Sequence, residues 1–196
     1  MKERIVAFFG DIDAALVSRA AGDRLTVYII GRSALVWRFG SKEVTADIDV
    51  LCPAEGPLLK AALDQYGRGT GKAKEHGLYL EHVAIVIPVM APGYRERATP
   101  FAGGWAVLEM FHLDPHDLII SKLVRFAAKD RQDIQYLCDQ GTIDPDKIRA
   151  LLKGAYPWVV DRKVEEEGWD DDPKARNAYE NVESVYRYLN GDSESV

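Results

Sequence analysis

The sequence predicts an α+β or α/β lobe over residues 1–112, followed by a helical lobe over residues 113–196. In the first lobe, runs of β-branched and aromatic residues alternate with segments whose apolar residues recur at helical spacing. From Asp114 onward, the apolar residues follow helical spacing throughout. We therefore expect a mixed sheet with flanking helices and a helical lobe that completes a cleft; the two lobes could also count as one domain.

The elements of the first lobe are expected in this order along the chain. Helices are predicted at residues 3–20, 34–38 and 57–66, and strands at 25–30, 46–51, 78–83, 84–90 and 105–112. Pro57 and Gly67 mark the start and the end of the third helix. The glycine-rich segment 67–72 is expected to be a flexible loop, and residues 94–97 a surface loop.

The second lobe begins with a strong helix start, Asp114-Pro115. This helix is expected to reach about Ala127, to break at residues 127–129, and to be followed by a helix with Asp130 as N-cap. Without the break, Lys122 and Asp133 would lie about 16 Å apart along one axis and could not serve one site. Further helices are expected from Asp144-Pro145, over 157–167 and over 175–189.

Composition narrows the class of protein. The 196 residues carry a net charge of −6 and a pI near 5.3, so any RNA contact would need a local basic patch. Cys52 and Cys138 are too few for a disulfide framework or a cysteine-based zinc site. The sequence shows neither a signal-peptide core nor an apolar run of membrane-spanning length, so we expect a soluble cytoplasmic protein.

Two Asp-x-Asp pairs differ in the chemistry they allow. Asp11 and Asp13 fall on a predicted helix, where residues two apart point about 200° apart, so we expect surface acids. Asp47 and Asp49 fall on a predicted strand, where residues two apart lie about 7 Å apart on one face. Two such carboxylates repel each other unless a cation compensates, which favours a metal site. An exposed strand end with solvated acids is the simpler alternative.

A small-residue turn, Gly31-Arg32-Ser33, precedes this acidic strand. Glycine lets the backbone approach a phosphate closely, and the start of the following helix attracts anions. A plain tight turn would explain the same residues. The nucleophile strand of haloacid-dehalogenase phosphatases also carries Asp-x-Asp, but the lead-in 41–46 is largely polar, and the preceding turn would stay unexplained.

Gly31-Arg32-Ser33 together with residues 45–50 resembles the core of the nucleotidyltransferase superfamily related to DNA polymerase β. Asp117-x₄-Lys122 and Asp130-x₂-Asp133 are similar to later motifs of abortive-infection (AbiEii-like) nucleotidyltransferase toxins and their uncharacterised relatives. The resemblance spans residues 31–133 and implies the minimal nucleotidyltransferase fold. Arg32 departs from it, because many relatives carry a second glycine there.

The resemblance also implies roles for individual residues. Asp47 and Asp49 would bind Mg²⁺ or Mn²⁺, and Gly31, Arg32 and Ser33 would hold the triphosphate. Lys122, in a row with Arg125 and Lys129, would assist at the phosphates, and Asp133 would orient Lys122 or the acceptor. Asp117 and the cation row have plainer interpretations, as a capping acid and a solvated stripe.

A third carboxylate is expected from a neighbouring strand, and two acids lie inside apolar strand segments, Glu81 and Glu109. Glu81 fits the motif order better, as a metal ligand or as the base that activates the attacking hydroxyl. His82, His112 and His116 lack zinc-type spacing and are expected to be structural.

The implied function is metal-dependent transfer of a nucleotide from a nucleoside triphosphate to an RNA, tRNA included, or to a protein hydroxyl. The toxin resemblance adds a cognate antitoxin as an expected partner. The alternative is a catalytically inactive domain that binds a nucleotide or a partner on the same scaffold.

Overall fold

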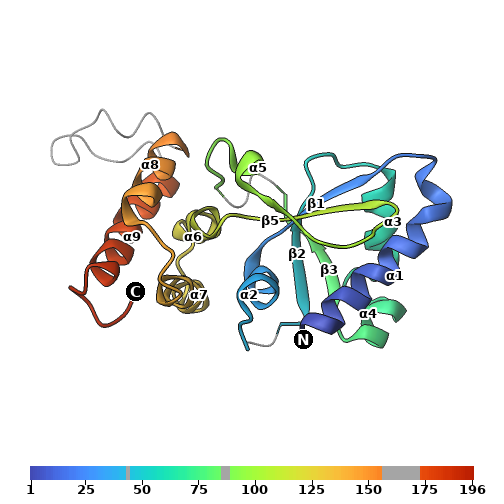
Figure 1. The fold of residues 1–196 in the computed structure, drawn as a ribbon, viewed down its shortest axis with the longest axis horizontal. Coiled ribbons are helices and arrows are strands. Elements are labelled where there is room, and N and C mark those ends of the chain that lie inside the picture. The colour runs from blue at the N-terminus through green and yellow to red at the C-terminus, as the bar shows by residue number, and fades with distance from the viewer. Residues whose placement is uncertain (43–44, 85–88, 156–172) are drawn as a thin grey trace. The chain divides into compact units, whose positions relative to one another are not determined.

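The computed structural model describes residues 1–42, 45–84, 89–155 and 173–196. It contains two compact units (Figure 1). The first comprises Met1–Ile87 with Arg97–Leu113, and the second comprises Pro88–Glu96 with Asp114–Val196. Among the described helices, none combines the length and the apolar character needed to cross a membrane.

The first unit is built on a mixed sheet with the strand order β3-β2-β1-β5-β4. Its strands are β1 (Leu25–Ile29), β2 (Asp47–Leu51), β3 (Tyr79–His82), β4 (Thr99–Pro100) and β5 (Leu108–His112). The pairs β1–β5 and β2–β3 are parallel, whereas β1–β2 and β4–β5 are antiparallel. The mixed sheet with flanking helices that the sequence predicts is therefore confirmed.

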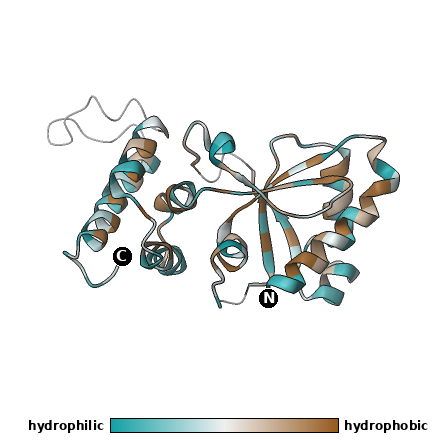
Figure 2. Cartoon of the chain, viewed as in Figure 1, coloured by the Kyte–Doolittle hydropathy of each residue, from teal (hydrophilic) through white to brown (hydrophobic). Residues whose placement is uncertain are grey.

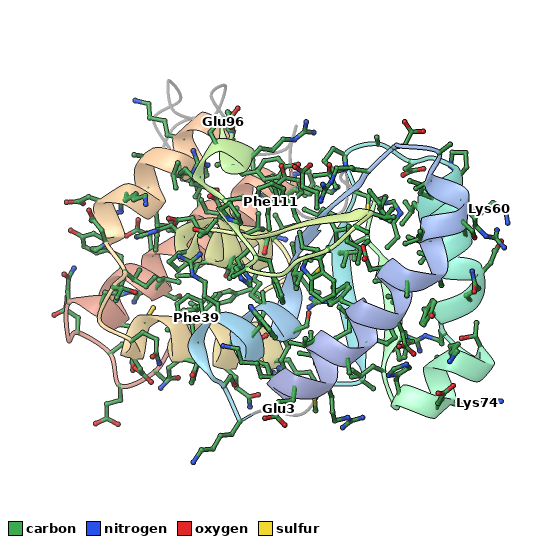
Figure 3. The ribbon with its side chains drawn as sticks, turned by 45° about the vertical axis from the view of Figure 1, so that its right-hand side comes forward. Glu3, Phe39, Lys60, Lys74, Glu96 and Phe111 are labelled. Carbon is green, nitrogen blue, oxygen red and sulfur yellow. The ribbon has the colours of Figure 1, made fainter. Side chains whose placement is uncertain are left out.

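Helices cover this sheet. They are α1 (Lys2–Ala20), α2 (Gly31–Phe39), α3 (Pro57–Tyr66) and α4 (Gly71–His76). Within the unit, α1 packs on α3, α3 and α4 pack beside β3, and α2 packs on β2 (Figure 1). The apolar stripe of α1, with Ile5, Phe8 and Leu16, is fully buried, whereas Lys60 points away from the sheet at the outer side of α3 (Figure 3).

Three expectations for this part of the chain need correction. The predicted loop 67–72 ends at Thr70, whose hydroxyl accepts the Ala73 N–H and so caps α4. The predicted helix 34–38 starts earlier, so the Gly31 turn is its first turn. Residues 94–97 form a short helix, α5 (Tyr94–Arg97), and not a loop. The predicted strand 84–90 lies largely outside the described residues.

The second unit contains α6 (Pro115–Leu123), α7 (Ala128–Asp139), α8 (Pro145–Ala155) and α9 (Pro173–Leu189). Helices α8 and α9 carry both polar and apolar faces (Figure 2), and their apolar residues, such as Leu152 and Val182, are buried. The helix predicted at 157–167 falls outside the described residues.

The predicted break between α6 and α7 is confirmed, with two differences. Helix α6 ends at Leu123, before the predicted Ala127, and the backbone then turns through Phe126, whose φ is 45°. Asp130 is not the N-cap of α7, because Ala127 occupies that position. The Asp130 carboxylate instead accepts the Ala127 N–H from the third helical position, at 3.0 Å.

His116 joins the starts of two helices. Its Nδ1 lies 2.7 Å from an Asp114 carboxylate oxygen, and its Nε2 accepts the Asp144 N–H at 3.0 Å. Nδ1 therefore carries the ring hydrogen and donates a hydrogen bond to the Asp114 carboxylate. Asp114 precedes α6 and Asp144 precedes α8, so the expectation of a structural histidine is confirmed here.

His112 is a second structural histidine, at the end of β5. Its ring stacks on Phe101 and Trp37, with centroids 5.0 and 6.2 Å away, and its buried Nδ1 has no hydrogen-bond partner among the described residues. Burial, with smaller contributions from Arg38 and Lys2, lowers the pKa of His112 from 6.5 to about 4. Between pH 6.5 and about 4, the ring therefore stays neutral in the folded protein, whereas in the unfolded chain it would be protonated.

This lowered pKa predicts a loss of stability in mild acid. Between pH 6.5 and 4 the unfolded chain binds a proton that the folded chain does not, so unfolding becomes easier as the pH falls. From pH 7 to pH 5 we expect His112 to cost about 2 kcal/mol of unfolding free energy. In His112→Phe, which keeps an aromatic ring in the stack, this part of the loss should vanish. Urea titrations of both proteins at the two pH values measure it, and an equal loss in both would contradict the assignment.

Candidate functional site

Three carboxylates converge on one face of the sheet. Along β2, Ile48 and Val50 are buried, while Asp47 and Asp49 alternate to the other face and are half-buried. Strand β3 pairs with β2 in parallel and sets Glu81 opposite Asp49. Asp47, Asp49 and Glu81 each offer an oxygen, and the three atoms lie within 4.8 Å of one another. The strand alternation of the two aspartates is thus as predicted, and it is Glu81 that joins them.

Glu109, the other candidate for the third carboxylate, lies elsewhere. It stands on β5 opposite Thr26 of β1 and accepts the Thr26 hydroxyl at 2.9 Å. Phe111 lies two residues further along β5 (Figure 3). Its ring stacks on that of Tyr28 of β1. Strand β5 is separated from β2 by β1, so Glu109 is not a member of the cluster.

Gly31 meets the cluster at the end of β1. Its φ is +64°, and a Cβ at this position would overlap the Asp49 Oδ2 atom. Both the backbone conformation and the close approach of Asp49 therefore require glycine. The Ile30 N–H donates to the Asp49 carbonyl at 3.0 Å, which fixes the turn to β2. The start of α2 is held directly against one of the three carboxylates.

We expect Gly31→Ala to reduce the nucleotide transfer that the sequence resemblance implies far more than its effect on stability explains. Gly40 offers a matched control, because its φ is +72° and no described atom lies within 4 Å of the position that a Cβ would take there. Both substitutions impose the left-handed strain, about 1 kcal/mol of unfolding free energy each. Only Gly31→Ala displaces Asp49. Transfer assays and urea titrations on both variants test this, and equal activity in the two would contradict it.

Helix α2 begins at this cluster. Its N-cap, Ile30, makes no side-chain capping hydrogen bond, and the first turn contains Gly31, Arg32 and Ser33. The Ser33 side chain is buried and donates to the Ile30 carbonyl at 2.9 Å. Because the Ser33 hydroxyl is already bonded to Ile30, we expect Ser33 to bind an anion first through its backbone N–H, as part of a helix N-terminus. Arg32 is half-buried on the same turn.

Sequence reasoning missed three further residues at the cluster. The Thr45 hydroxyl donates to Asp47 Oδ1. The Arg68 guanidinium donates to Glu81 Oε2 at 3.0 Å and lies 4.6 Å above the Tyr79 ring. The hydrogen bond with Glu81 is the main reason that the pKa of Arg68 is raised, and the Asp47 charge adds to it. Period-two alternation on β3 would have found Tyr79, two residues before Glu81.

The other Asp-x-Asp pair is structural, and one expectation for it is wrong. Asp13 is not a surface acid, because it is only 8% exposed. Its carboxylate accepts the backbone N–H groups of Ala106, Val107 and Leu108 at 2.7–2.8 Å. Asp11 is half-exposed, as expected, and contacts His76 Nε2 at 3.0 Å. The two side chains diverge, which agrees with the helical geometry.

In the second unit, the later motifs form a buried ion-pair cluster. Lys122 Nζ donates to Asp133 at 2.8 Å and lies 3.5 Å from Asp130. Arg125 makes two hydrogen bonds of 2.7 Å to Asp130. The prediction that the break brings Asp133 back to Lys122 is confirmed. The single row of Lys122, Arg125 and Lys129 is not, since α6 ends at Leu123 and Lys129 belongs to α7. Asp117 is fully buried in the first turn of α6.

Burial makes Lys122 important for stability. Its side chain is 7% exposed, and those of Asp133 and Asp130 are 6% and 1% exposed. Lys122→Met should lower the unfolding free energy by about 3–5 kcal/mol, because it removes the ammonium from the buried Asp133, whereas Asp130 keeps Arg125. The double variant Lys122→Met with Asp133→Leu should recover part of this loss. The exposed Lys153→Met in α8 is the control, and denaturant titration showing equal stability of Lys122→Met and Lys153→Met would contradict the assignment.

The carboxylate cluster has the chemistry of a divalent-cation site. Mg²⁺ and Mn²⁺ prefer oxygen ligands, and three carboxylate oxygens within 4.8 Å can converge on such an ion. Asp11, Glu75 and His76 also bring three ligand-type atoms together, but Lys72 Nζ contacts both Asp11 and Glu75, at 3.7 and 3.0 Å. Each acidic group thus has a basic side chain beside it, Arg68 at the first and Lys72 at the second, and the first differs in that it adjoins a helix N-terminus.

Comparison with known proteins supports this chemistry. Residues 7–187 match the model of a protein family described as nucleotidyltransferase of unknown function (DUF6036). Comparisons with curated proteins and with solved structures found no match. The family match covers both structural units and includes every residue of the carboxylate cluster.

Proposed function

The chain belongs to this family of nucleotidyltransferases, and from this premise we propose that Asp47, Asp49 and Glu81 bind a divalent metal for nucleotide transfer. In this reaction a hydroxyl group attacks the α-phosphate of a nucleoside triphosphate, the bond between the α- and β-phosphates breaks, and pyrophosphate leaves. The observation that carries the proposal is the convergence of three carboxylates at the N-terminus of α2. Nucleotide transfer needs a cation to offset phosphate charge and donors to hold the triphosphate, and this arrangement offers ligands for the cation and backbone donors for the triphosphate.

The carboxylates and their neighbours have distinct parts in this proposal. Mg²⁺ or Mn²⁺ bound here would neutralise charge on the transferred phosphate and on the leaving oxygens. Thr45 holds one oxygen of Asp47 and leaves the other for a ligand. Gly31 lets Asp49 approach the phosphate-binding turn. Glu81 completes the ligand set or accepts the proton of the attacking hydroxyl.

The triphosphate would bind at the first turn of α2. The backbone N–H groups of Gly31, Arg32 and Ser33 and the positive end of the helix favour an anion there. Lys122 and Arg125, by contrast, pair with Asp133 and Asp130. A phosphate contact from them would require them to exchange those carboxylates for phosphate oxygens. We therefore assign the phosphates first to α2, and the completion of the site by residues 113–196 stays a prediction.

We propose an RNA hydroxyl, with a tRNA end as the first candidate, as the acceptor. The resemblance to nucleotidyltransferase toxins supports it and also supports a toxin role with a cognate antitoxin as partner. The test is incubation with Mg²⁺, each α-³²P-labelled nucleoside triphosphate and total RNA or total protein. The proposal expects label in RNA. Label in protein alone would overturn the acceptor, and no label with any donor would count against transfer itself.

One observation favours the alternative of a catalytically inactive binding domain. Arg68 already pairs with Glu81, and an arginine can take the place of a cation among carboxylates. Binding of metal and triphosphate would fit both functions, so binding cannot separate them. Turnover separates them, since the inactive domain would bind a labelled nucleotide and never transfer it.

A further inference from the structure

Arg68 is held beside the carboxylate cluster by the backbone around it. Helix α3 ends at Tyr66, and the next residue, Gly67, forms a parallel bridge with Leu80 of β3. A Cβ on Gly67 would overlap the Leu63 carbonyl oxygen, so only glycine allows this close path. Leu80 points into the core, so its neighbours Tyr79 and Glu81 lie on the other face. The bridge therefore delivers Arg68 to the face that carries the cluster.

The side chain of Arg68 contacts two residues of β3 and is nevertheless largely exposed to solvent. It lies over the Tyr79 ring at 4.6 Å and reaches Glu81 Oε2 at 3.0 Å, but it is 70% exposed. Exposed ion pairs of this kind are weak, because water screens the charges. A divalent ion among three carboxylates would interact with Glu81 more strongly than Arg68 does. It would also repel the guanidinium, since both would lie against the same carboxylate.

We propose that Arg68 is the resident counter-ion of the Asp47–Asp49–Glu81 cluster, and that it leaves Glu81 when the divalent ion binds and then contacts the phosphates of the incoming nucleotide. This inference rests on the proposed function. The Tyr79 ring keeps the released guanidinium close to the site, and a planar guanidinium can bind phosphate oxygens in pairs. Removal of Arg68 should therefore strengthen metal binding and weaken nucleotide binding.

The test measures Mn²⁺ binding to the full chain without nucleotide, by the loss of the free-ion electron paramagnetic resonance signal. Arg68→Gln removes a competing cation and should bind Mn²⁺ about three- to tenfold more tightly than the wild type. Arg19→Gln is the matched control, because it removes an exposed arginine from the last turn of α1 and changes the net charge equally. It should leave Mn²⁺ affinity unchanged.

The second measurement is the affinity for a non-hydrolysable nucleoside triphosphate at saturating Mn²⁺, by calorimetry. Arg68→Gln should bind it at least about threefold more weakly than the wild type and Arg19→Gln. Unchanged or weaker Mn²⁺ binding by Arg68→Gln would overturn the counter-ion role, and unchanged triphosphate binding would overturn the phosphate role. In both cases the proposed function would stand if Asp49→Asn abolished Mn²⁺ binding. Absence of Mn²⁺ binding by the wild type would instead refute the proposed metal site itself.

Discussion

Asp49→Asn is expected to lower nucleotide transfer by about a thousandfold or more. Asp49 lies between Asp47 on its own strand and Glu81 on the neighbouring one, and it touches the Gly31 turn. Its replacement by an amide removes a charged ligand and places an NH₂ donor at a position that needs an acceptor. Loss of one such interaction costs several kcal/mol of transition-state stabilisation. Initial rates with Mg²⁺ and a labelled nucleoside triphosphate measure it.

Glu109→Gln is the matched control for this variant. Glu109 is also a strand carboxylate of the first unit, but it pairs with Thr26 outside the cluster. Its transfer rate should stay within about twofold of wild type, because surface changes away from a site have small effects. Glu81→Gln should have an intermediate effect, since Glu81 already shares its charge with Arg68. A normal rate for Asp49→Asn, or equal losses in Asp49→Asn and Glu109→Gln, would remove the catalytic role.

Asp13→Asn is expected to destabilise the protein by about 3 kcal/mol or more. The Asp13 carboxylate accepts three backbone N–H groups that lead into β5, at 2.7–2.8 Å. An amide keeps one acceptor oxygen and turns an NH₂ donor towards N–H groups, so buried donors lose their partner. Burial by itself raises the pKa of Asp13, but the three backbone hydrogen bonds outweigh it and the pKa is lowered.

The lowered pKa of Asp13 fixes the pH range of this effect. Its stabilisation is present above the unfolded value of 3.8 and is lost as the pH falls through the folded pKa. Asp11→Asn is the control on the same helix, because Asp11 is half-exposed. It should change the unfolding free energy by less than about 1 kcal/mol. Urea unfolding at pH 7 compares the variants, and similar stability of Asp13→Asn and Asp11→Asn would show that the three hydrogen bonds contribute little.

Local pattern predicted the parts of this protein that depend on neighbouring residues. Period-two alternation placed Asp47 and Asp49 on one strand face, with Ile48 and Val50 in the core. The helix starts predicted at Pro57, Pro115 and Pro145 are all confirmed. The break before α7 followed from the length of an unbroken helix, and it brings Asp133 to Lys122.

Features that depend on distant parts of the chain could not be predicted from local sequence pattern. Helical spacing showed that the side chains of Asp11 and Asp13 diverge. The backbone N–H groups that donate to the buried Asp13 carboxylate, however, lie more than ninety residues away in the sequence. Arg68 stands in a glycine-rich segment, and its place beside Glu81 follows from the Gly67–Leu80 bridge. In the sequence, Lys122 has the pattern of a solvent-exposed cation on a helix. Its burial follows only from the fold, which brings Asp130 and Asp133 against it.

The most direct test of the central claim is nucleotide transfer by the Asp47→Asn/Asp49→Asn double variant. The variant and the wild type are incubated with Mg²⁺, the labelled nucleoside triphosphate that the wild type uses and its acceptor, after circular dichroism has shown that both are folded. The carboxylate site predicts transfer by the wild type that stops with excess EDTA and returns with added Mg²⁺, and no transfer by the double variant. Transfer by the double variant at the wild-type rate would contradict it.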